Sequence, residues 1–493
     1  MMDLNDFIKS FLFTSESQGI VGYVVDIKSR FLAMSNAFHS EFGTKTPSKN
    51  KNSYQYIQSD KGKFFHENCQ TLKEHNQFVV DSKLHHVFLY VVNESDFTRL
   101  YIVHKYPIIF NDIVQAIYTS FQPYCFPRVP DLTFISFGVE LYARPLSSQY
   151  RLTARQRLII FFLVRNHSYT EISAWMKAFG YHISPNRVNE HITNLKAIFK
   201  VNDKQELVSK AIMSGYYSEI PSGLLPTGAY LIDDYLFKLN IIKNYSHGDT
   251  PLFVKPISLL ETNSFCSDQA NILCDIQIQD YIDKIAVFYS QTDHAVCIVD
   301  LFGNLLANTN SFACHKIWHD DFIKGVLDKN SKQLSEKYLY ITEVNENKEI
   351  FIIRIYPIVS SSNQVIAYTI RVIPYIMPSI PKIMEVVFKI IRMPTDEICI
   401  NYNFTKKQYV ILYFYIRNYG NQEISKTLSA LDMKVTVHTV NKHLENIKKI
   451  LKINHKSQLM DKGTVLCYHL VPTELLKLGL FPLDNTLVEN WIC

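Results

Sequence analysis

One segment of this chain occurs twice. Shifting the sequence by 252 positions places residues 152–210 on residues 404–462 without a gap, and many of the paired residues are identical. The identities include Glu171-Ile172-Ser173 with Glu423-Ile424-Ser425, Val188-Asn189 with Val440-Asn441, and His191 with His443. Because this period is far longer than the ~20 to 50 residues of a solenoid repeat, it indicates duplicated domains.

Each copy is predicted to form four short helices. Thr153 with Gln156, like Thr405 with Gln408, has the spacing of a capping box, in which two side chains satisfy backbone amides at a helix start. Apolar residues with helical periodicity follow in both copies. The third helix is predicted to begin at Ser184-Pro185, because Ser is a favourable N-cap and Pro is tolerated in the first turn.

The third helix of each copy combines a narrow apolar stripe with a polar arc. The stripe residues recur at i, i+4, i+7 and i+11 and are expected to pack on the rest of the domain. They are Val188, Ile192, Leu195 and Phe199 in the first copy and Val440, Leu444, Ile447 and Leu451 in the second. The candidates for entering a DNA groove are Arg187, Asn189, Glu190, His191, Thr193, Asn194 and Lys196, and Thr439, Asn441, Lys442, His443, Asn446, Lys448 and Lys449.

The order of these residues resembles the LuxR-type helix-turn-helix. That family opens with Thr-x-x-Gln or Thr-x-x-Glu, starts its scaffold helix with Glu-Ile-Ser or Glu-Ile-Ala, and marks its recognition helix by Val-x-x-His and spaced apolar residues. The matching positions are Thr153, Glu171-Ile172-Ser173, Val188 and His191, then Thr405, Glu423-Ile424-Ser425, Val440 and His443. The resemblance implies two all-α readers of double-stranded DNA, which in this family usually act as symmetric dimers.

Both copies depart from the family pattern in the same three ways. Asn166 and Asn418 stand where glycine is usual, which is tolerable because Asn also adopts positive φ. The segment between scaffold and recognition helices, residues 178–183 in the first copy, is longer than usual, so the angle of the recognition helix is left open. Asn189 and Asn441 replace a basic residue, although Asn can still pair bidentately with adenine.

Basic charge is concentrated on the two copies. Residues 151–216 hold 10 Lys and Arg against 4 Asp and Glu, and residues 404–470 hold 11 against 4, whereas the whole chain is only +5. Such a concentration suits the neutralisation of DNA phosphates, although a solvated helical face also carries lysines.

The groove-facing positions of the two copies differ. Lys442 stands where the first copy has Glu190, and Lys449 stands where it has Ala197. Because Lys neutralises phosphate and Glu does not, the copies are predicted to contribute unequally. Lys442→Ala is predicted to cost more DNA affinity than Glu190→Ala.

A second repeat lies upstream of each reader and resembles the PAS domain. Residues 6–38 match residues 280–312 at an offset of 274, whereas Tyr106-Pro107-Ile108 matches Tyr356-Pro357-Ile358 at an offset of 250. Because the offset falls between these two matches, the first copy has extra residues. They are predicted to lie in the polar run 45–59. Two apolar runs around Gly303-Asn304 predict a hairpin. The remaining predicted strands lie within Gly22 to Phe38, Val87 to Val92, Arg99 to Tyr106, Ile113 to Phe121, Phe351 to Tyr356 and Val365 to Val372.

The PAS resemblance implies a sensory or dimerisation role, with a small-molecule ligand as a candidate partner. The alternative is an unrelated α+β dimerisation domain with the same hairpins. No cofactor is predicted, because Cys69 lacks the surroundings of a flavin-binding cysteine and the histidines lack ligand spacing. The histidines considered are His39, His66, His85 and His86.

No catalytic motif stands out. The sequence has no phosphate-binding loop, dinucleotide-binding glycine pattern, nucleophile elbow or His-Glu-x-x-His, so no enzyme and no metal site is predicted. No apolar run approaches the ~18 residues of a membrane helix, and no leader pattern opens the chain, so no membrane partner is expected. Nine cysteines without Cys-x-x-Cys fit reduced thiols in a bacterial cytoplasm.

The predicted fold class is α+β, with two PAS-like α/β sensory domains alternating with two all-α readers through tandem duplication. The function predicted is a transcription regulator that forms a pseudo-dimer within one chain, with homodimerisation and contact with RNA polymerase left open. The alternative is a protein-interaction module that uses these folds without binding DNA. The predicted boundaries are 1–125 and 278–378 for the sensory domains, 150–216 and 402–470 for the readers, 217–277 for a connector and 471–493 for a tail.

Overall fold

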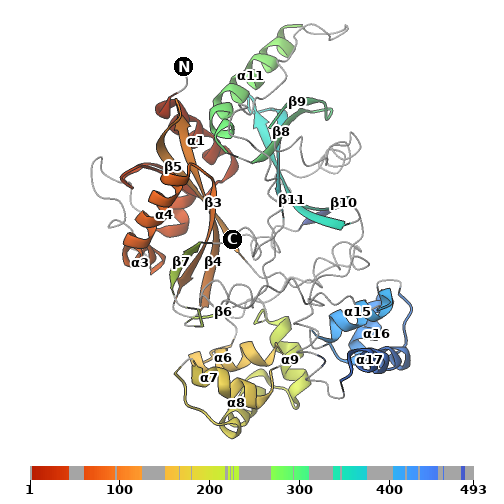
Figure 1. Ribbon diagram of the computed structural model, residues 1–493. Helices are drawn as coiled ribbons and strands as arrows, with labels where there is room; N and C mark the ends of the chain where they lie inside the picture. The colour runs from red at the N-terminus through yellow and green to blue at the C-terminus, as the bar shows by residue number, and fades with distance from the viewer. Residues whose placement is uncertain are drawn as a thin grey trace.

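The computed structural model describes an α+β chain with two antiparallel sheets and two helical units (Figure 1). The described residues are 3–43, 60–94, 97–124, 150–165, 167–178, 180–216, 220–222, 224–225, 227–231, 268–292, 294–309, 337–344, 347–374, 404–416, 419–430, 433–453, 459 and 479–483. Both helical units lie at the same end of the molecule (Figure 1).

The first sheet lies in the N-terminal unit, called the first sensory domain after its predicted role; the unit of the second sheet is called the second sensory domain in the same way. The strands of the first sheet run in the order β2-β1-β5-β4-β3-β7, and β6 pairs with β4. Three helices between β2 and β3 contribute to an aromatic core on one face, where Phe38, Phe65 and Phe121 pack against one another. The strands are β1 (Gly22–Asp26), β2 (Phe31–Met34), β3 (His86–Asn93), β4 (Phe97–Phe110) and β5 (Ile113–Tyr124), and the helices are α2 (Asn36–Phe42), α3 (Asp60–Glu67) and α4 (Cys69–Ser82).

The second sheet has the same strand order, β9-β8-β12-β11-β10-β13. The registers also correspond: Val24 lies opposite Tyr118 in the first sheet, and Ile298 lies opposite Thr369 in the second. A register shift follows Val24 in β1 and Ile298 in β8, at the same offset of 274. The strands are β8 (Ala295–Asp300), β9 (Leu305–Asn308), β10 (Lys337–Val344), β11 (Asn347–Val359), β12 (Val365–Pro374) and β13 (Gly479–Leu483).

Strands that follow the readers in sequence return to the sensory sheets. Strands β6 (Ile220–Pro221) and β7 (Gly228–Leu231) join the first sheet, where Gly228 lies opposite Val91. Strand β13 joins the second sheet, where Gly479 lies opposite Ile341. Strands β6 and β7, which lie in the segment that the sequence pattern assigned to the connector, therefore belong to the first sheet.

The two helical units are called reader 1 and reader 2 after their predicted role; the structure describes all four predicted helices of reader 1 and the first three of reader 2. Both capping boxes are confirmed, with Thr153 and Thr405 each accepting from the amide of the Gln three residues later. The helices of reader 1 are α6 (Ala154–Leu163), α7 (Tyr169–Ala178), α8 (Pro185–Phe199) and α9 (Lys204–Met213). Those of reader 2 are α15 (Lys406–Tyr415), α16 (Asn421–Ala430) and α17 (Val437–Leu451).

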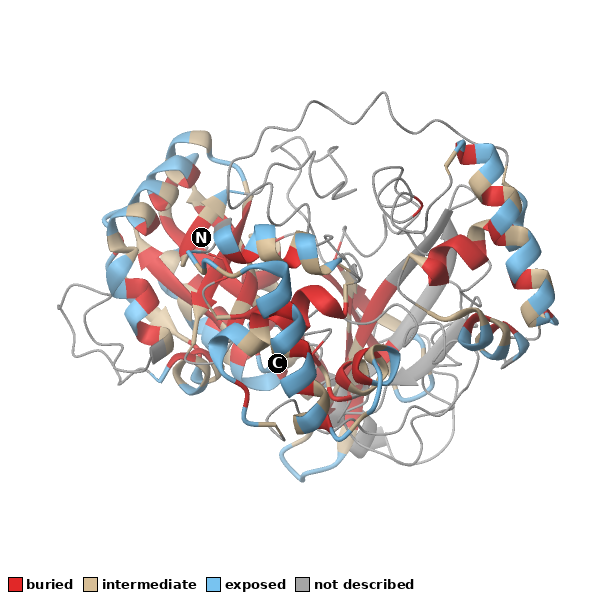
Figure 2. Ribbon diagram, turned by 90° about the horizontal axis from the view of Figure 1, so that it is seen from below, coloured by how far each residue is buried: buried red, intermediate tan, exposed pale blue. Residues whose placement is uncertain are grey.

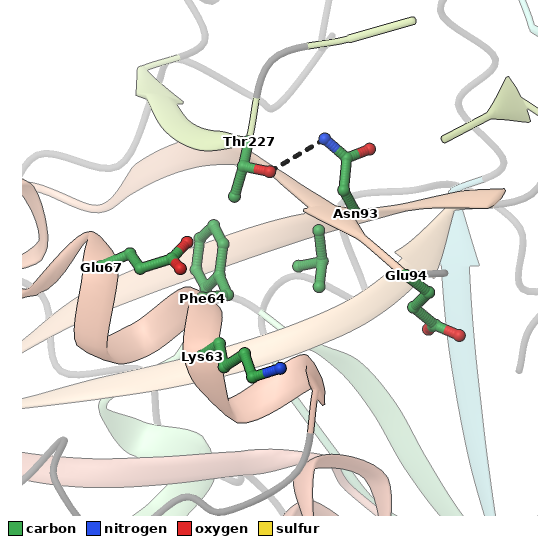
Figure 3. A pocket seen from close by; sticks show the side chains of 7 residues that line it. Lys63, Phe64, Glu67, Asn93, Glu94 and Thr227 are labelled. Carbon is green, nitrogen blue, oxygen red and sulfur yellow. Dashed lines mark hydrogen bonds between the residues drawn. The ribbon is translucent and has the colours of Figure 1, made fainter. Parts of the chain in front are cut away.

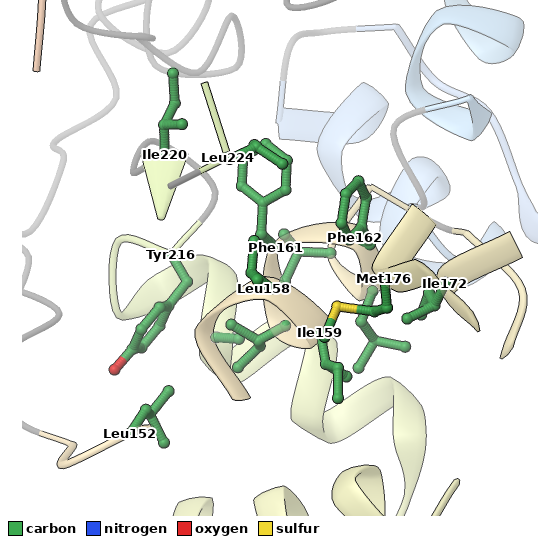
Figure 4. Close-up of a cluster of buried hydrophobic side chains, with 14 of the residues drawn as sticks. Leu152, Leu158, Ile159, Phe161, Phe162, Ile172, Met176, Tyr216, Ile220 and Leu224 are labelled. Atoms are coloured by element: carbon green, nitrogen blue, oxygen red, sulfur yellow. The ribbon is translucent and has the colours of Figure 1, made fainter. Parts of the chain in front are cut away.

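The second half of the opening helix α6, residues 158–163, is buried, and it packs in one cluster with the first sheet. One cluster joins residues of α6, α7 and α8 to Val87, Leu89 and Val91 of β3. Figure 4 shows Phe161 and Leu158 of α6 together with Ile220 and Leu224 from the segment that returns to the sheet. Reader 1 and the first sensory domain thus share a core.

Helices α1 (Leu4–Gln18) and α11 (Asp268–Ser290) lie side by side and join the two sensory domains (Figure 1). Their apolar residues form one cluster with the outer faces of both sheets, including Val24 of β1 and Ile298 of β8. The Ser10 hydroxyl donates to the carbonyl of Lys284 at 2.5 Å and accepts from the amide of Phe288 at 3.0 Å. Asp6 and Asp280, the equivalent first residues of the two aligned segments, thus lie in α1 and α11.

Several predictions fall outside the described residues. They concern Asn166 and Asn418, the polar run 45–59, connector residues 232–267, the helix predicted after α17 apart from Leu459, and tail residues 484–493. None of the described helices is both long and apolar enough to cross a membrane.

Candidate nucleic-acid interface

The apolar stripe of each recognition helix is confirmed. Val188, Ile192, Leu195 and Phe199 of α8 are buried, as are Val440, Leu444, Ile447 and Leu451 of α17. Each stripe anchors its helix on the core of its own reader. Burying this stripe leaves the polar arc of each helix on the other side.

A pair of equivalent hydrogen bonds fixes the longer segment before each recognition helix. The Ser173 hydroxyl of α7 donates to the carbonyl of Ile183 at 2.6 Å, and the Ser425 hydroxyl of α16 donates to the carbonyl of Val435 at 2.7 Å. Each acceptor directly precedes the N-cap residue of its recognition helix. The longer segment is therefore held in the same way in both readers.

The candidate residues divide into exposed and partly buried groups. Figure 2 views the molecule from the reader end, where exposed residues cover the outer sides of the helices. The exposed candidates are Arg187, Asn189, Glu190, Thr193, Asn194, Asn441, Lys442 and Lys449. The partly buried candidates are His191, Lys196, Thr439, His443, Asn446 and Lys448.

The arc of reader 1 contains an internal ion pair. Arg187 Nη1 lies 2.5 Å from Glu190 Oε2, one helical turn along the same exposed face. This pair offsets the only arginine of the arc, so the face presents mainly the amide and hydroxyl groups of Asn189, Thr193 and Asn194. Reader 1 therefore offers hydrogen-bonding groups more than net charge.

The arc of reader 2 keeps more net positive charge. Lys448 Nζ pairs with Glu445 at 3.2 Å, whereas Lys442 and Lys449 are exposed and have no ion pair among the described residues. The Asn421 side chain of α16 donates to Asn441 Oδ1 at 2.5 Å. Reader 2 therefore combines two available ammonium groups with an amide that the scaffold helix holds in place.

A basic residue of the opening helix lies beside the histidine of each recognition helix. Burial lowers the pKa of His191 and of His443, and the nearby cations Arg155 and Lys407 lower each pKa further. Both rings are therefore neutral near pH 7. Arg155 and Lys407 are exposed, and they are equivalent at the offset of 252. The alignment of the two copies therefore pairs two basic residues here, although neither is among the predicted DNA-contacting residues.

A hydrogen bond between described residues joins the two readers. The Ser209 hydroxyl of α9 donates to Glu423 of α16 at 3.4 Å. Glu423 also accepts from the amide of Gly420 at 2.6 Å, where the equivalent Glu171 accepts from the amide of Ser168. The fourth helix of one reader thus contacts the scaffold helix of the other.

The first sensory domain has a cavity of about 360 Å³ near the segment that returns from reader 1. Lys63, Phe64 and Glu67 of α3 line it together with Asn93 and Thr227, and Figure 3 shows the hydrogen bond of 2.9 Å between the last two. A ligand in this cavity would contact α3 and β3 of the first sensory domain as well as Thr227, which directly precedes β7.

The inner core of the same domain contains a buried amine. Burial lowers the pKa of Lys105 to about 7, and its Nζ lies 2.5 Å from Asn76 Oδ1. Burial, with the nearby Lys105, lowers the pKa of His75 to about 3. Cys69 is a free thiol at the start of α4, and no group of three or more potential metal ligands is present among the described residues.

The sequence matches no protein-family model and no curated protein. Among solved structures, the chain is similar to the Vibrio cholerae VqmA–ligand–DNA complex, with 16% identity over 48% of this chain and 99% of that one and a TM-score of 0.33. It is also similar to the phage VqmA–DPO complex, with 14% identity over 42% of this chain and 99% of that one and a TM-score of 0.32. An RNA-binding light-oxygen-voltage receptor overlaps 72% of this chain and 95% of its own at 10% identity and a TM-score of 0.16.

Proposed function

We propose that the chain is a transcription regulator that binds double-stranded DNA in a sequence-specific manner through two unequal LuxR-type readers. The observation that carries the proposal is the matched geometry of the two readers. Each buries a stripe, presents a polar arc, and fixes its recognition helix with a scaffold serine, Ser173 or Ser425. A polar helical face of this kind fits the major groove.

Reader 2 supplies phosphate contacts and reader 1 supplies base contacts in this proposal. Lys442 and Lys449 are exposed, and no described carboxylate pairs with them, which leaves their charge for phosphate oxygens. Asn189 and Asn194 are exposed amides, and an amide can pair bidentately with adenine. Arg155 and Lys407 extend the candidate surface beyond the recognition helices.

The two halves act as a pseudo-dimer formed by tandem duplication. Equal strand order, equal registers and the α1–α11 contact support this part of the proposal. The proposed division keeps sensory domains at 1–125 and 278–378 and readers at 150–216 and 402–470, and assigns the returning strands β6, β7 and β13 to the sensory sheets. One chain then presents both readers to an operator.

The sensory domains are PAS-like in this proposal, which rests on the sequence resemblance and on the equal strand order of the two sheets. The effector is a small molecule, for which the cavity beside Phe64 and Thr227 is a candidate position. RNA polymerase is a candidate partner once the readers occupy DNA. No enzymatic activity is assigned.

Selection of bound duplexes from a random pool tests the function. The full chain is incubated with the pool at fixed salt, and the recovered sequences are aligned. The proposal predicts two distinct half-sites at one fixed spacing, bound by one chain per duplex in analytical ultracentrifugation. Recovery of sequences with no shared motif would contradict sequence-specific binding.

An interaction module is the second candidate function. The Arg187–Glu190 ion pair and the Ser209–Glu423 contact favour it, because both use reader groups within the protein. The two candidates differ in their salt dependence, since phosphate neutralisation makes DNA affinity fall steeply with salt. A chain that binds neither random nor selected duplexes would favour the interaction module.

A further inference from the structure

Two arginines face each other on the second sensory sheet. Arg354 of β11 and Arg371 of β12 are direct cross-strand partners. Their neighbours Ile353 and Ile370 line the inner core of the sheet, so the two arginines project from its outer face. Like charges in directly opposite positions repel each other.

Neither guanidinium is neutralised by a described residue. The Nε atoms of Arg354 and Arg371 are buried and have no hydrogen-bond partner, and neither side chain pairs with a carboxylate among the described residues. A buried donor without a partner is costly, and in native proteins it commonly marks a bound water, ion or ligand. The rest of each side chain is only partly buried, so a solute can reach it.

Arg371 lies beside His294, and His294 in turn packs against an aromatic ring of the first sensory domain. Arg371 Nη2 lies 3.4 Å from Nδ1 of His294, whose ring lies 5.7 Å from the ring of Tyr106 in the first sheet. His85 stacks on Tyr106 at 4.1 Å, and its Nε2 lies 3.1 Å from Nδ1 of His104. The interface cationic cluster is defined as Arg354 and Arg371, which supply its positive charge, with the neighbouring rings of His294, His85 and His104; the Nδ1 of His294 accepts from Arg371.

Arg371 reaches the other sensory domain and the helix pair as well. Burial raises the pKa of Tyr118 in β5 and of Tyr289 in α11, and the Arg371 guanidinium acts in the opposite direction on both. Tyr289 itself donates to Gln18 of α1 at 2.5 Å. An anion at Arg371 would therefore lie against elements of both sensory domains.

We propose that the interface cationic cluster binds one small oxyanion, a phosphate- or carboxylate-bearing molecule, between the two sensory domains. A guanidinium offers two parallel N–H donors that match phosphate and carboxylate oxygens, and a bound anion removes the repulsion between Arg354 and Arg371. The equivalent cross-strand pair in the first sheet is His104 and Ser120. A cross-strand pair of guanidinium groups therefore occurs at this position in only one of the two described sheets. The proposed site does not depend on DNA binding by the readers.

Isothermal titration of the full chain tests the proposal. Inorganic phosphate and succinate are titrated separately in chloride buffer at constant ionic strength, which distinguishes a phosphate from a carboxylate ligand. We expect one of them to bind once per chain. Arg371→Gln and Arg354→Gln should each raise Kd by about tenfold or more, because each removes a charge-assisted hydrogen bond.

The matched control is Arg30→Gln, which removes a guanidinium that is already paired with Asp26 at 2.6 Å. This variant should leave Kd unchanged. Lys442→Ala should also leave Kd unchanged, and that result would exclude anion binding at Lys442 of reader 2. If Arg371→Gln does not fold, Arg371→Lys is used instead. It keeps the positive charge but lacks the two parallel N–H donors of a guanidinium, so it should still weaken binding. Absence of binding by both anions, or equal binding by the wild type and the Arg371 variants, would overturn the proposal.

Discussion

The two readers share the same buried core and helix caps, and they differ in the side chains of their exposed arcs. The buried stripes, capping boxes and scaffold-serine hydrogen bonds recur at the same offset. On the exposed arc, Glu190 of reader 1 pairs with Arg187, whereas Lys442 stands at the same place in reader 2 without an ion-pair partner among the described residues. The core residues keep the helix in position, so the arc can change without loss of the fold.

The two sensory domains differ in a similar way, but inside the core. Lys105 of β4 is fully buried, and the equivalent residue of β11 is Ile355, which is also buried. Conversely, Arg354 and Arg371 of the second sheet replace His104 and Ser120 of the first. Charge has therefore been placed in the inner core of one domain and on the outer face of the other.

The largest expected effect concerns the buried lysine. Because its pKa is lowered from 10.5 to about 7, the unfolded chain binds more protons than the folded one between these values. The free energy of unfolding of the first sensory domain should therefore rise by about 4 kcal/mol from pH 7 to pH 10. Lys105→Ile, which introduces the residue found at the equivalent position of β11, should abolish this rise.

Urea denaturation with pulse proteolysis at a series of pH values measures this effect, since each half gives its own fragment. The reciprocal variant Ile355→Lys serves as the matched control and should introduce a pH dependence into the second half. An unchanged pH profile in Lys105→Ile would show that the amine is not the titrating group.

Next in size are the buried stripes of the recognition helices. Leu195→Ala in α8 and Ile447→Ala in α17 should each destabilise its own reader by about 2 to 4 kcal/mol, because each leaves a cavity in a packed core. Thermal unfolding followed by circular dichroism measures the change. If the two variants lose very different amounts of stability, the buried cores of the two readers are not equivalent.

A smaller effect is expected for the hydrogen bonds that fix the recognition helices. Ser173→Ala and Ser425→Ala should each cost about 1 kcal/mol, because a carbonyl loses its hydroxyl partner. Chemical denaturation of each variant gives the value. Ser429→Ala provides a control in α16, since its hydroxyl bonds to a carbonyl of the same helix.

The smallest effects concern DNA affinity and compare the arcs directly. Lys442→Ala should weaken duplex binding several-fold, by about 0.5 to 1 kcal/mol, through loss of a phosphate contact. Glu190→Ala should strengthen binding slightly, because it releases the Arg187 guanidinium. Fluorescence anisotropy at fixed salt ranks the two, and the reverse order would contradict the division of roles between the readers.

Features that depend on spacing along the chain could be predicted from the sequence. The capping boxes and the apolar stripes need only the periodicity of a helix, and the Arg187–Glu190 pair has the i, i+3 spacing that favours contact. The returning strands were missed because they are short, although Ile220-Pro221 and Gly228 recur as Val471-Pro472 and Gly479 at an offset of 251.

Features that depend on tertiary packing could not be predicted. The interface cationic cluster assembles residues from both sheets, and nothing in the local sequence places His85 near His294. The burial of Lys105 likewise depends on α4, which supplies Asn76 as its partner. In both cases the chemistry arises from elements that are distant in the chain.

The salt dependence of duplex binding tests DNA recognition by the unequal readers most directly. We predict a steep fall of log affinity with log salt for the wild type, and a slope reduced by about 2 in the double variant Lys442→Ala, Lys449→Ala, since each lysine releases about one counterion. Arg187→Ala should change the slope less, because Glu190 already compensates that charge. A slope near zero in the wild type, or one that the double variant leaves unchanged, would contradict DNA binding through reader 2.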